Sequence, residues 1–310
     1  MITVDDVRAA REAIGDDLHR TPVFSSRTLG ANVFLKAELF QRTGSFKPRG
    51  VLNKLRSLSQ EERARGVIGV SAGNHAQALA FGGAVEGIDA LLVMWRSASP
   101  AKIEATRGYG AEVDLEADGP ETVFDRLEEL MAETGRTLVH PFDDPLVAAG
   151  QGTVGLELAE QVEDVDTVVV PVGGGGLISG IAAALPDKRV IGVEPAGSNA
   201  LSLGLAQNEP VHVSPRSIAD GLNAPFAGTL AIELARRHEV QLVLVEEDEI
   251  EDAFRFLYER AKLACEPAAA ASVAAILSGK IPLAEEETVV AVVSGGNVSG
   301  ETAAAILARP

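Results

Sequence analysis

The sequence has little cysteine and little positive charge, and each shortage excludes a class of protein. Cys265 is the only cysteine among the 310 residues, so no disulfide can form within the chain and a reducing compartment, the cytoplasm, is expected. Lysine and arginine total 27 against 45 acidic residues, which gives a formal net charge of −18. Because binding to phosphate backbones needs a basic surface, no nucleic-acid partner is expected.

The sequence also shows no pattern of a signal peptide and no uninterrupted apolar span, so neither a leader nor a membrane helix is expected. Residues 1–20 carry acids and bases throughout, so they lack the apolar core of a signal peptide. Residues 167–186 are all uncharged and are long enough to cross a bilayer. Pro171 and the glycines at 173–176 would break a membrane helix in its middle. The stretch therefore predicts a buried strand, a loop and a buried helix, and no membrane association is expected.

Strand and helix patterns alternate along the chain. β-branched runs predict strands over 67–71, 90–95, 137–140, 167–172, 189–194, 240–245 and 288–294. Apolar spacing and turn signals predict helices over 75–85, 101–109, 120–134, 151–162, 178–184 and 249–264. Such alternation is typical of an α/β fold whose parallel sheet is covered by helices. The turn-rich run 141–145 is the best candidate for a domain boundary.

One lysine stands in an unusual setting. Lys47 lies between Phe46 and Pro48, in a chain with only seven lysines among its 27 basic residues. A desolvated lysine can lose its proton and attack a carbonyl carbon, whereas arginine stays charged. A lysine near a turn is more often a solvated surface residue, so this position alone is weak support for catalysis.

Three loops strengthen the functional interpretation of Lys47. They are 71–75 (Ser-Ala-Gly-Asn-His), 173–177 (Gly-Gly-Gly-Gly-Leu) and 294–297 (Ser-Gly-Gly-Asn), and each follows a predicted strand. In open α/β sheets, ligands bind beyond the carboxyl ends of the strands. Consecutive glycines let backbone N–H groups close around a phosphate, and a helix start favours an anion. A single such loop could be an ordinary tight turn, but three together predict one binding site.

The glycine loop narrows the choice of cofactor. It lacks the G-x-G-x-x-G spacing of dinucleotide sites and the lysine of a Walker A loop. A phosphate site combined with a candidate Schiff-base lysine points to pyridoxal 5′-phosphate, whose ring withdraws electrons from the substrate.

These motifs resemble the threonine dehydratase and serine racemase family, within the fold-type II (tryptophan synthase β-like) pyridoxal-phosphate enzymes. The resemblance is collinear over nearly the whole chain and runs through 20–22, 45–50, 71–77, 140–145, 149–153, 173–177, 217–221, 266–267 and 294–297. It implies two open, twisted, mostly parallel sheets with helices on both faces and the cofactor in a cleft between two lobes. Residues 1–52 and 142–310 would form the larger lobe and residues 53–141 the smaller one. No C-terminal regulatory domain is expected.

The resemblance also implies residue roles. Lys47 would form the Schiff base with the cofactor and later move protons at the substrate Cα. The implied cofactor contacts are Phe46 beside the ring, Asn74 at the phenolic oxygen, Ser294 at the pyridine nitrogen, and Gly173, Gly174, Gly175, Gly176 and Leu177 around the phosphate. The loop of Ser71, Ala72, Gly73, Asn74 and His75 would take the substrate carboxylate. A histidine that begins a helix, as His75 does, is more often a structural hydrogen-bond donor than a base.

The implied reaction is a β-elimination, most directly of L-threonine to 2-oxobutanoate and ammonia, with L-serine to pyruvate as a side activity. A hydroxyl at Ser294 does not enforce protonation of the pyridine nitrogen, so prompt loss of a β-hydroxyl suits the site. Serine racemases carry a serine where this chain has Ala72, which disfavours racemisation. A serine or aspartate racemase and a 3-hydroxyaspartate dehydratase stay open as alternatives.

Other departures from relatives bear on rival functions. Cysteine and threonine synthases usually show an aspartate where this chain has Pro48, which disfavours a transferase. Relatives that bind a divalent cation carry a glutamate followed six residues later by an aspartate. Glu194 matches the first position but Ala200 stands at the second, so no metal site is expected. A homodimer or homotetramer is expected from the family.

Overall fold

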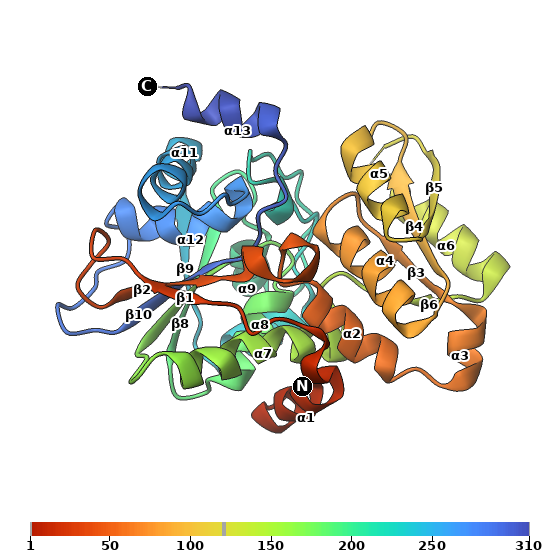
Figure 1. Cartoon of the computed structure of the whole chain (residues 1–310), viewed down its shortest axis with the longest axis horizontal. Helices are drawn as coiled ribbons and strands as arrows, with labels where there is room; N and C mark the ends of the chain where they lie inside the picture. The colour runs from red at the N-terminus through yellow and green to blue at the C-terminus, as the bar shows by residue number, and fades with distance from the viewer. Residues whose placement is uncertain (1, 120–121, 310) are drawn as a thin grey trace.

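The computed structural model describes residues 2–119 and 122–309, which form two separate β-sheets covered by helices (Figure 1). The larger sheet has six strands and the smaller has four. Every strand pair is parallel except that of the first two strands, which run antiparallel. The predicted α/β fold with two mostly parallel sheets is confirmed.

The six-stranded sheet brings the two ends of the chain together. Its order is β1-β2-β10-β7-β8-β9. The strands are β1 (Val23–Ser25), β2 (Val33–Ala37), β7 (Thr167–Pro171), β8 (Arg189–Pro195), β9 (Gln241–Val245) and β10 (Val289–Val293). β10 lies between β2 and β7 and is parallel to both. The segments that follow β2 and β10 therefore emerge at the same edge of the sheet.

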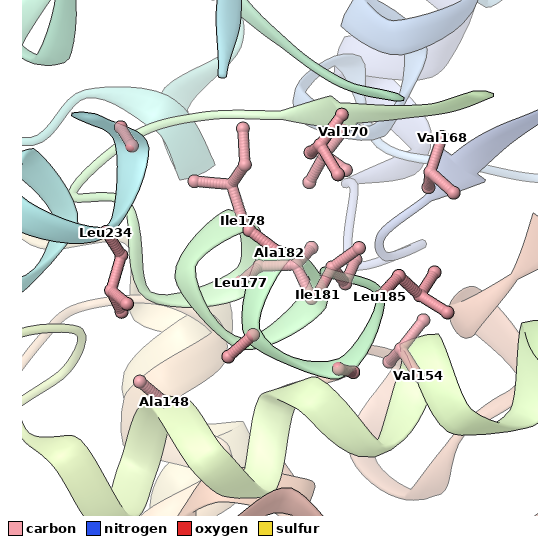
Figure 2. Packing of buried hydrophobic residues seen from close by; sticks show 14 of the residues in the cluster. Ala148, Val154, Val168, Val170, Leu177, Ile178, Ile181, Ala182, Leu185 and Leu234 are labelled. Carbon is pink, nitrogen blue, oxygen red and sulfur yellow. The ribbon is translucent and has the colours of Figure 1, made fainter. Parts of the chain in front are cut away.

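Alternate residues of the central strands face opposite helix layers, as the pleat requires. Val168 and Val170 face the first layer, whereas Val169 faces the second. The first layer consists of α1 (Val4–Ile14), α7 (Pro145–Gln161), α8 (Gly176–Ala184), α9 (Ala200–Gln207) and α10 (Thr229–Arg237). Figure 2 shows α8 between these two valines on one side and Ala148 and Val154 of α7 on the other.

The second layer consists of α11 (Glu247–Phe256), α12 (Pro267–Leu277) and α13 (Gly300–Leu307). α12 is built mainly from alanine, and its residues from Pro267 to Ile276 are all buried. Small side chains let this helix lie close against the strands, so it forms the centre of the layer.

The four-stranded sheet has the order β5-β4-β3-β6. Its strands are β3 (Val67–Val70), β4 (Ala90–Trp95), β5 (Glu112–Ala117) and β6 (Thr137–Leu138). α2 (Pro48–Arg56), α4 (Asn74–Glu86) and α5 (Pro100–Gly108) pack on one face, and α6 (Val123–Thr134) packs on the other. The short α3 (Gln60–Arg65) leads into β3.

All seven predicted strands are present, and their ends lie within two residues of the predicted ones. The largest errors in the predicted helix boundaries concern α7 and α11. α7 begins at Pro145 rather than at 151, because the Asp144 carboxylate caps the N–H groups of Leu146 and Val147. α11 ends at Phe256 rather than at 264, because a π-helical turn follows and Lys262 has a left-handed φ of 60°.

The helix predicted from 120 begins at Val123, and Pro120 and Glu121 lie outside the described residues. None of the helices in the described ranges is long and apolar enough to cross a membrane.

Candidate active site

Lys47 lies at the start of α2, where the segment after β2 passes the segment after β10. Ser45 forms an isolated antiparallel bridge with Gly295. The N–H of Phe46 donates to the carbonyl oxygen of Ser294 at 3.2 Å, and Ser294 itself is buried. The structure therefore places the candidate lysine and the third predicted loop next to each other, although they come from opposite ends of the sequence.

The amine of Lys47 is largely shielded from water. Nζ donates to the carbonyl oxygen of Pro141 at 2.8 Å and lies 5.1 Å from the centre of the Phe46 ring. Burial lowers the pKa of Lys47 to about 8, and the carboxylate of Glu266 opposes this shift. Near neutral pH a usable fraction of the amine is uncharged and can act as a nucleophile.

The loop 71–75 connects β3 to α4, and its two ends differ in exposure. Ser71 Oγ accepts from the N–H of Gly73 at 3.1 Å, and a Cβ at Gly73 would meet nothing closer than this oxygen, at 4.0 Å. His75 points inward instead, and its Nε2 donates to the carbonyl oxygen of Val139 at 2.8 Å. Burial lowers the pKa of His75 to about 3, so the ring is neutral at physiological pH. The open side of the loop consists of its backbone and of Ser71, Ala72 and Gly73.

The glycine loop connects β7 to α8 and is pinned against protein atoms. A Cβ at Gly174 would lie 2.3 Å from the ring of Phe142, and one at Gly173 would lie 3.0 Å from Leu222. Gly175 has a left-handed φ of 91° and caps α8, which a residue with a side chain would rarely do. The first N–H groups of α8 have no acceptor within the helix, so they can bind an anion.

Glu266 and Asn297, to which the sequence assigned no role, link the loop at 71–75 to the segment after β10. Nδ2 of Asn297 donates to Oδ1 of Asn74 at 2.8 Å and to the carbonyl oxygen of Thr43 at 2.7 Å. Nδ2 of Asn74 donates to Oε1 of Glu266 at 2.7 Å. We call Asn74, Glu266 and Asn297 the amide cluster. Glu266 and Asn297 both stand within the motifs given for the resemblance, but no spacing rule links them to Asn74.

The turn before Lys47 is strained. Thr43 has a φ of 59°, which is rare for a β-branched residue, and Gly44 follows with a φ of 73°. A Cβ at Gly44 would lie 2.6 Å from Oδ1 of Asn297. The hydrogen bond from Asn297 to the Thr43 carbonyl oxygen therefore holds the turn in its unusual conformation.

A second polar cluster lies near the start of α2, where α2 meets β2 and α7. It contains Lys36, Glu38, Arg49 and Glu157, which we call the ion cluster. Arg49 bridges the two carboxylates, with Nε 2.8 Å from Glu38 Oε2 and Nη1 2.6 Å from Glu157 Oε1. Lys36 Nζ donates to Glu157, to Gln161 and to the Thr21 carbonyl oxygen. These bonds tie the start of α2 to β2 and α7.

Glu194, which matches one position of the cation site in some relatives, has its carboxylate in hydrogen bonds with the start of α9. Oε1 accepts from the N–H of Leu201 at 2.7 Å, and Oε2 accepts from the N–H of Ser202 at 2.9 Å. No group of three or more histidine, cysteine or acidic residues in the described ranges could hold a metal ion. Glu194 thus caps α9 in this structure.

Comparison with known proteins identifies the family. The family described as "Pyridoxal-phosphate dependent enzyme" matches residues 14–295, which includes Lys47 and the loops at 71–75 and 173–177. The chain belongs to this family. Pyridoxal phosphate is therefore its cofactor, as the sequence predicted.

Relatives within the family are similar over almost the whole chain. A catabolic L-threonine dehydratase of Staphylococcus aureus (strain N315) is 44% identical over 310 residues, which cover 96% of this chain and 90% of the relative. The structure of maize serine racemase is 37% identical, with a TM-score of 0.92, and the match covers 97% and 95% of the two chains. That of threonine deaminase isoform 2 from Solanum lycopersicum is 33% identical, with a TM-score of 0.89, and covers 98% and 87%. The fold is thus that of the fold-type II pyridoxal-phosphate enzymes.

The residues present fit this cofactor. Lys47 offers a desolvated amine for its aldehyde carbon, and the start of α8 offers backbone N–H groups for its phosphate. Among the described residues, Oγ of Ser45 and Oγ1 of Thr43 are buried without a hydrogen-bond partner, on either side of Gly44. Unpaired buried polar atoms are costly, so their presence beside Lys47 is typical of a site that binds a polar ligand.

Proposed function

We propose that this pyridoxal-phosphate enzyme is an L-threonine ammonia-lyase, which converts L-threonine to 2-oxobutanoate and ammonia and acts on L-serine as a side reaction. The observation that carries the proposal is the amine of Lys47, which burial brings to a pKa of about 8 between the loops after β2 and β10. The similarity to a catabolic L-threonine dehydratase over 96% of the chain supports the choice of substrate.

In this proposal each sequence-predicted residue keeps the role that the resemblance implied. Lys47 holds the cofactor, Phe46 lies beside its ring, Asn74 donates to its phenolic oxygen and Ser294 faces its pyridine nitrogen. Gly173, Gly174, Gly175, Gly176 and Leu177 bind its phosphate. The backbone of the loop from Ser71 to His75 binds the substrate carboxylate. Support comes from the free helix start at α8, the open side of Gly73 and the buried position of Ser294.

Proton transfer falls to Lys47. The bound cofactor supplies an electron-withdrawing ring that stabilises negative charge on the substrate Cα. Once released from the cofactor, the amine of Lys47 removes the Cα proton, because its lowered pKa leaves it partly uncharged near neutral pH. Phe46 and the contact of Nζ with the Pro141 carbonyl oxygen keep this amine in one place and exclude water from it. The β-hydroxyl then leaves as water, taking up a proton that balances the one removed from Cα. The resulting enamine tautomerises and is hydrolysed to the 2-oxo acid and ammonia.

A racemase is the second candidate, because serine racemases share this fold closely. Ala72 weighs against it, since it has no proton to give to the opposite face of Cα. Exchanging Ala72→Ser should add some formation of D-serine from L-serine while elimination continues. If the parent already forms D-serine as fast as pyruvate, the racemase is the better assignment. A 3-hydroxyaspartate dehydratase is a third candidate, to be tested with that substrate.

The decisive experiment follows 2-oxobutanoate release from L-threonine by the cofactor-loaded protein. Lys47→Ala should lower the rate by about 10²- to 10⁴-fold or more, the range for a lost acid–base group. Lys54→Ala is a matched control, because this lysine belongs to α2 and pairs with Asp144, which has no predicted role in the site. No release by a parent protein that has bound cofactor would reject the substrate.

We further propose the division into lobes of residues 1–52 with 142–310 and of residues 53–141, the latter carrying the four-stranded sheet. A homodimer or homotetramer in the cytoplasm is proposed from family resemblance and from the single cysteine, which is free and buried. The hydroxy amino acid is the proposed small-molecule partner. Sedimentation analysis of the purified protein tests the assembly state.

A further inference from the structure

We propose that Glu266 is a positioning residue of the cofactor site, which holds the Asn74 amide and alters its strength as a donor when the carboxyl gains or loses a proton. This inference rests on the proposed function through the contact of Asn74 with the phenolic oxygen of the cofactor. It assigns a role to a buried acid that the reaction outlined above does not use.

Geometry fixes the Asn74 amide from both ends. Asn297 donates to its Oδ1, and its Nδ2 donates to Glu266 Oε1 at 2.7 Å. Nδ2 carries two N–H groups and Glu266 takes one, so the second can donate to a ligand. Glu266 is fixed in turn, because its own N–H donates to the Gly295 carbonyl oxygen at 3.1 Å. A Cβ at Gly295 would lie 2.5 Å from Glu266 Oε1, so the carboxyl lies tightly against the loop after β10.

The charge of Glu266 changes near neutral pH. Its pKa is raised to about 7, mainly by burial and then by the charge of Asp220, whereas the hydrogen bond from Asn74 and the charges of Lys102 and Lys47 lower it. These charged groups come from three other parts of the fold: the turn at 220–222, α5 and the start of α2. The adjacent thiol of Cys265 is neutral, because burial raises its pKa.

The protonation state has a direct effect on Asn74. An ionised Glu266 accepts strongly from one N–H and places a negative charge beside the other, which weakens donation to an anionic oxygen. A neutral Glu266 removes that charge. The phenolic oxygen of the bound cofactor should therefore hold its negative charge more readily when Glu266 is neutral than when it is ionised.

The pKa of Glu266 can be altered by substituting a partly exposed ion pair, without changing Glu266 itself. Lys102 Nζ pairs with Asp220 Oδ2, and these side chains are 30% and 54% exposed. Asp220→Asn removes a charge that raises the pKa of Glu266, so the transition should move to lower pH. Lys102→Met removes a charge that lowers this pKa, so the transition should move to higher pH. A merely structural role for Glu266 gives no reason for opposite shifts.

The test is a pH titration of the visible absorption of the cofactor-loaded protein, from about pH 5 to about pH 9, without substrate. We expect a transition within this range in the parent and none in Glu266→Gln, which keeps the shape and can still accept from Asn74. Glu194→Gln is the matched control, because Glu194 is also a buried acid but caps α9. This control should keep the parent transition.

The exposed variants keep the proposal testable if Glu266→Gln fails to fold. Shifts in opposite directions for Asp220→Asn and Lys102→Met support it. A transition unchanged in Glu266→Gln, or unmoved in both exposed variants, overturns it. Because no substrate is present, a wrong choice of amino acid leaves this result untouched, and the threonine assay fails or succeeds independently.

Discussion

The ion cluster and the amide cluster differ in how completely their groups are paired. In the ion cluster, two buried cations face two buried carboxylates, and Arg49 uses its whole guanidinium on partners. Its neighbours hold the pKa of Glu38 below the ordinary value in spite of burial. Each charge in this cluster has its opposite within reach.

The amide cluster is less complete. Burial brings the pKa of Glu266 to about 7, although Lys47 and Lys102 favour its charged form. In the part of the chain that the structure describes, Ser45 Oγ, Thr43 Oγ1 and His75 Nδ1 are buried nearby without hydrogen-bond partners. The cluster also holds the strained turn at Thr43.

The difference indicates a division of labour around one lysine. A fully paired cluster fixes the backbone and changes little with pH, so the ion cluster holds the start of α2 in place. Perturbed and unpaired groups are typical of binding sites, where a ligand completes the pairing. Stability should therefore depend most on the first cluster, and cofactor binding most on the second.

The largest effect on stability is expected from a substitution that disrupts the ion cluster. Arg49→Met leaves Glu38 and Glu157 buried and unbalanced, which should lower the free energy of unfolding by about 3 to 5 kcal/mol. Urea unfolding of the parent and of the variant measures this difference in the free energy of unfolding. Arg8→Met is the control, because Arg8 forms only an exposed pair with Asp5, and its loss should cost no more than about 1 kcal/mol. Equal losses in both variants would contradict the special place of the ion cluster.

A smaller effect is expected on the stability of the protein at acidic pH. His75 has a pKa of about 3 in the folded protein against an ordinary value near 6.5, so below about pH 6.5 the unfolded chain binds a proton that the folded one refuses. Stability is therefore lost as the pH falls from about 6.5 toward 3, by about 2 kcal/mol near pH 5. In His75→Gln this part of the slope should disappear. Parallel unfolding curves against pH for the two proteins would refute the assignment.

The smallest effect on stability is expected from a substitution in the amide cluster, which should change cofactor affinity more than the free energy of unfolding. Asn297→Ala removes the donor to Asn74 and to the Thr43 carbonyl oxygen, both partly buried. Unfolding should change by only about 1 kcal/mol, whereas cofactor affinity should fall by about tenfold, as a lost hydrogen bond to a positioning amide implies. Fluorescence titration with pyridoxal phosphate measures it. A stability loss as large as that of Arg49→Met would contradict the proposed difference between the two clusters.

Much of this arrangement could be predicted from the sequence. β-branched runs located most of the parallel strands, since strands buried on both faces need such residues. The antiparallel β1 and the parallel β2, near the start of the chain, were not predicted. The loops at 71–75, 173–177 and 294–297 were predicted to form one binding site, because ligands bind beyond the carboxyl ends of parallel strands. The sequence did not indicate that the first loop follows a strand of the smaller sheet and the other two follow strands of the larger sheet. β5 was not predicted, because its residues Glu112–Ala117 mix charged and apolar side chains at the edge of the small sheet.

The pairing of side chains could not be predicted in the same way. Asn74 and Glu266 are 192 residues apart, and nothing in their local patterns indicates that they meet. The same holds for Lys36 and Glu157, which look like ordinary surface charges until β2 and α7 pack together. Buried polar contacts depend on tertiary packing, which periodicity does not encode.

The most direct test of the central claim is the pKa of the Lys47 amine. The rate at which cofactor-free protein captures pyridoxal phosphate should follow the uncharged amine, with Lys47→Ala giving the background. We expect half-maximal capture near pH 8, because burial outweighs the attraction of Glu266. A rate that rises only toward about pH 10.4, as for a solvated lysine, would contradict the account.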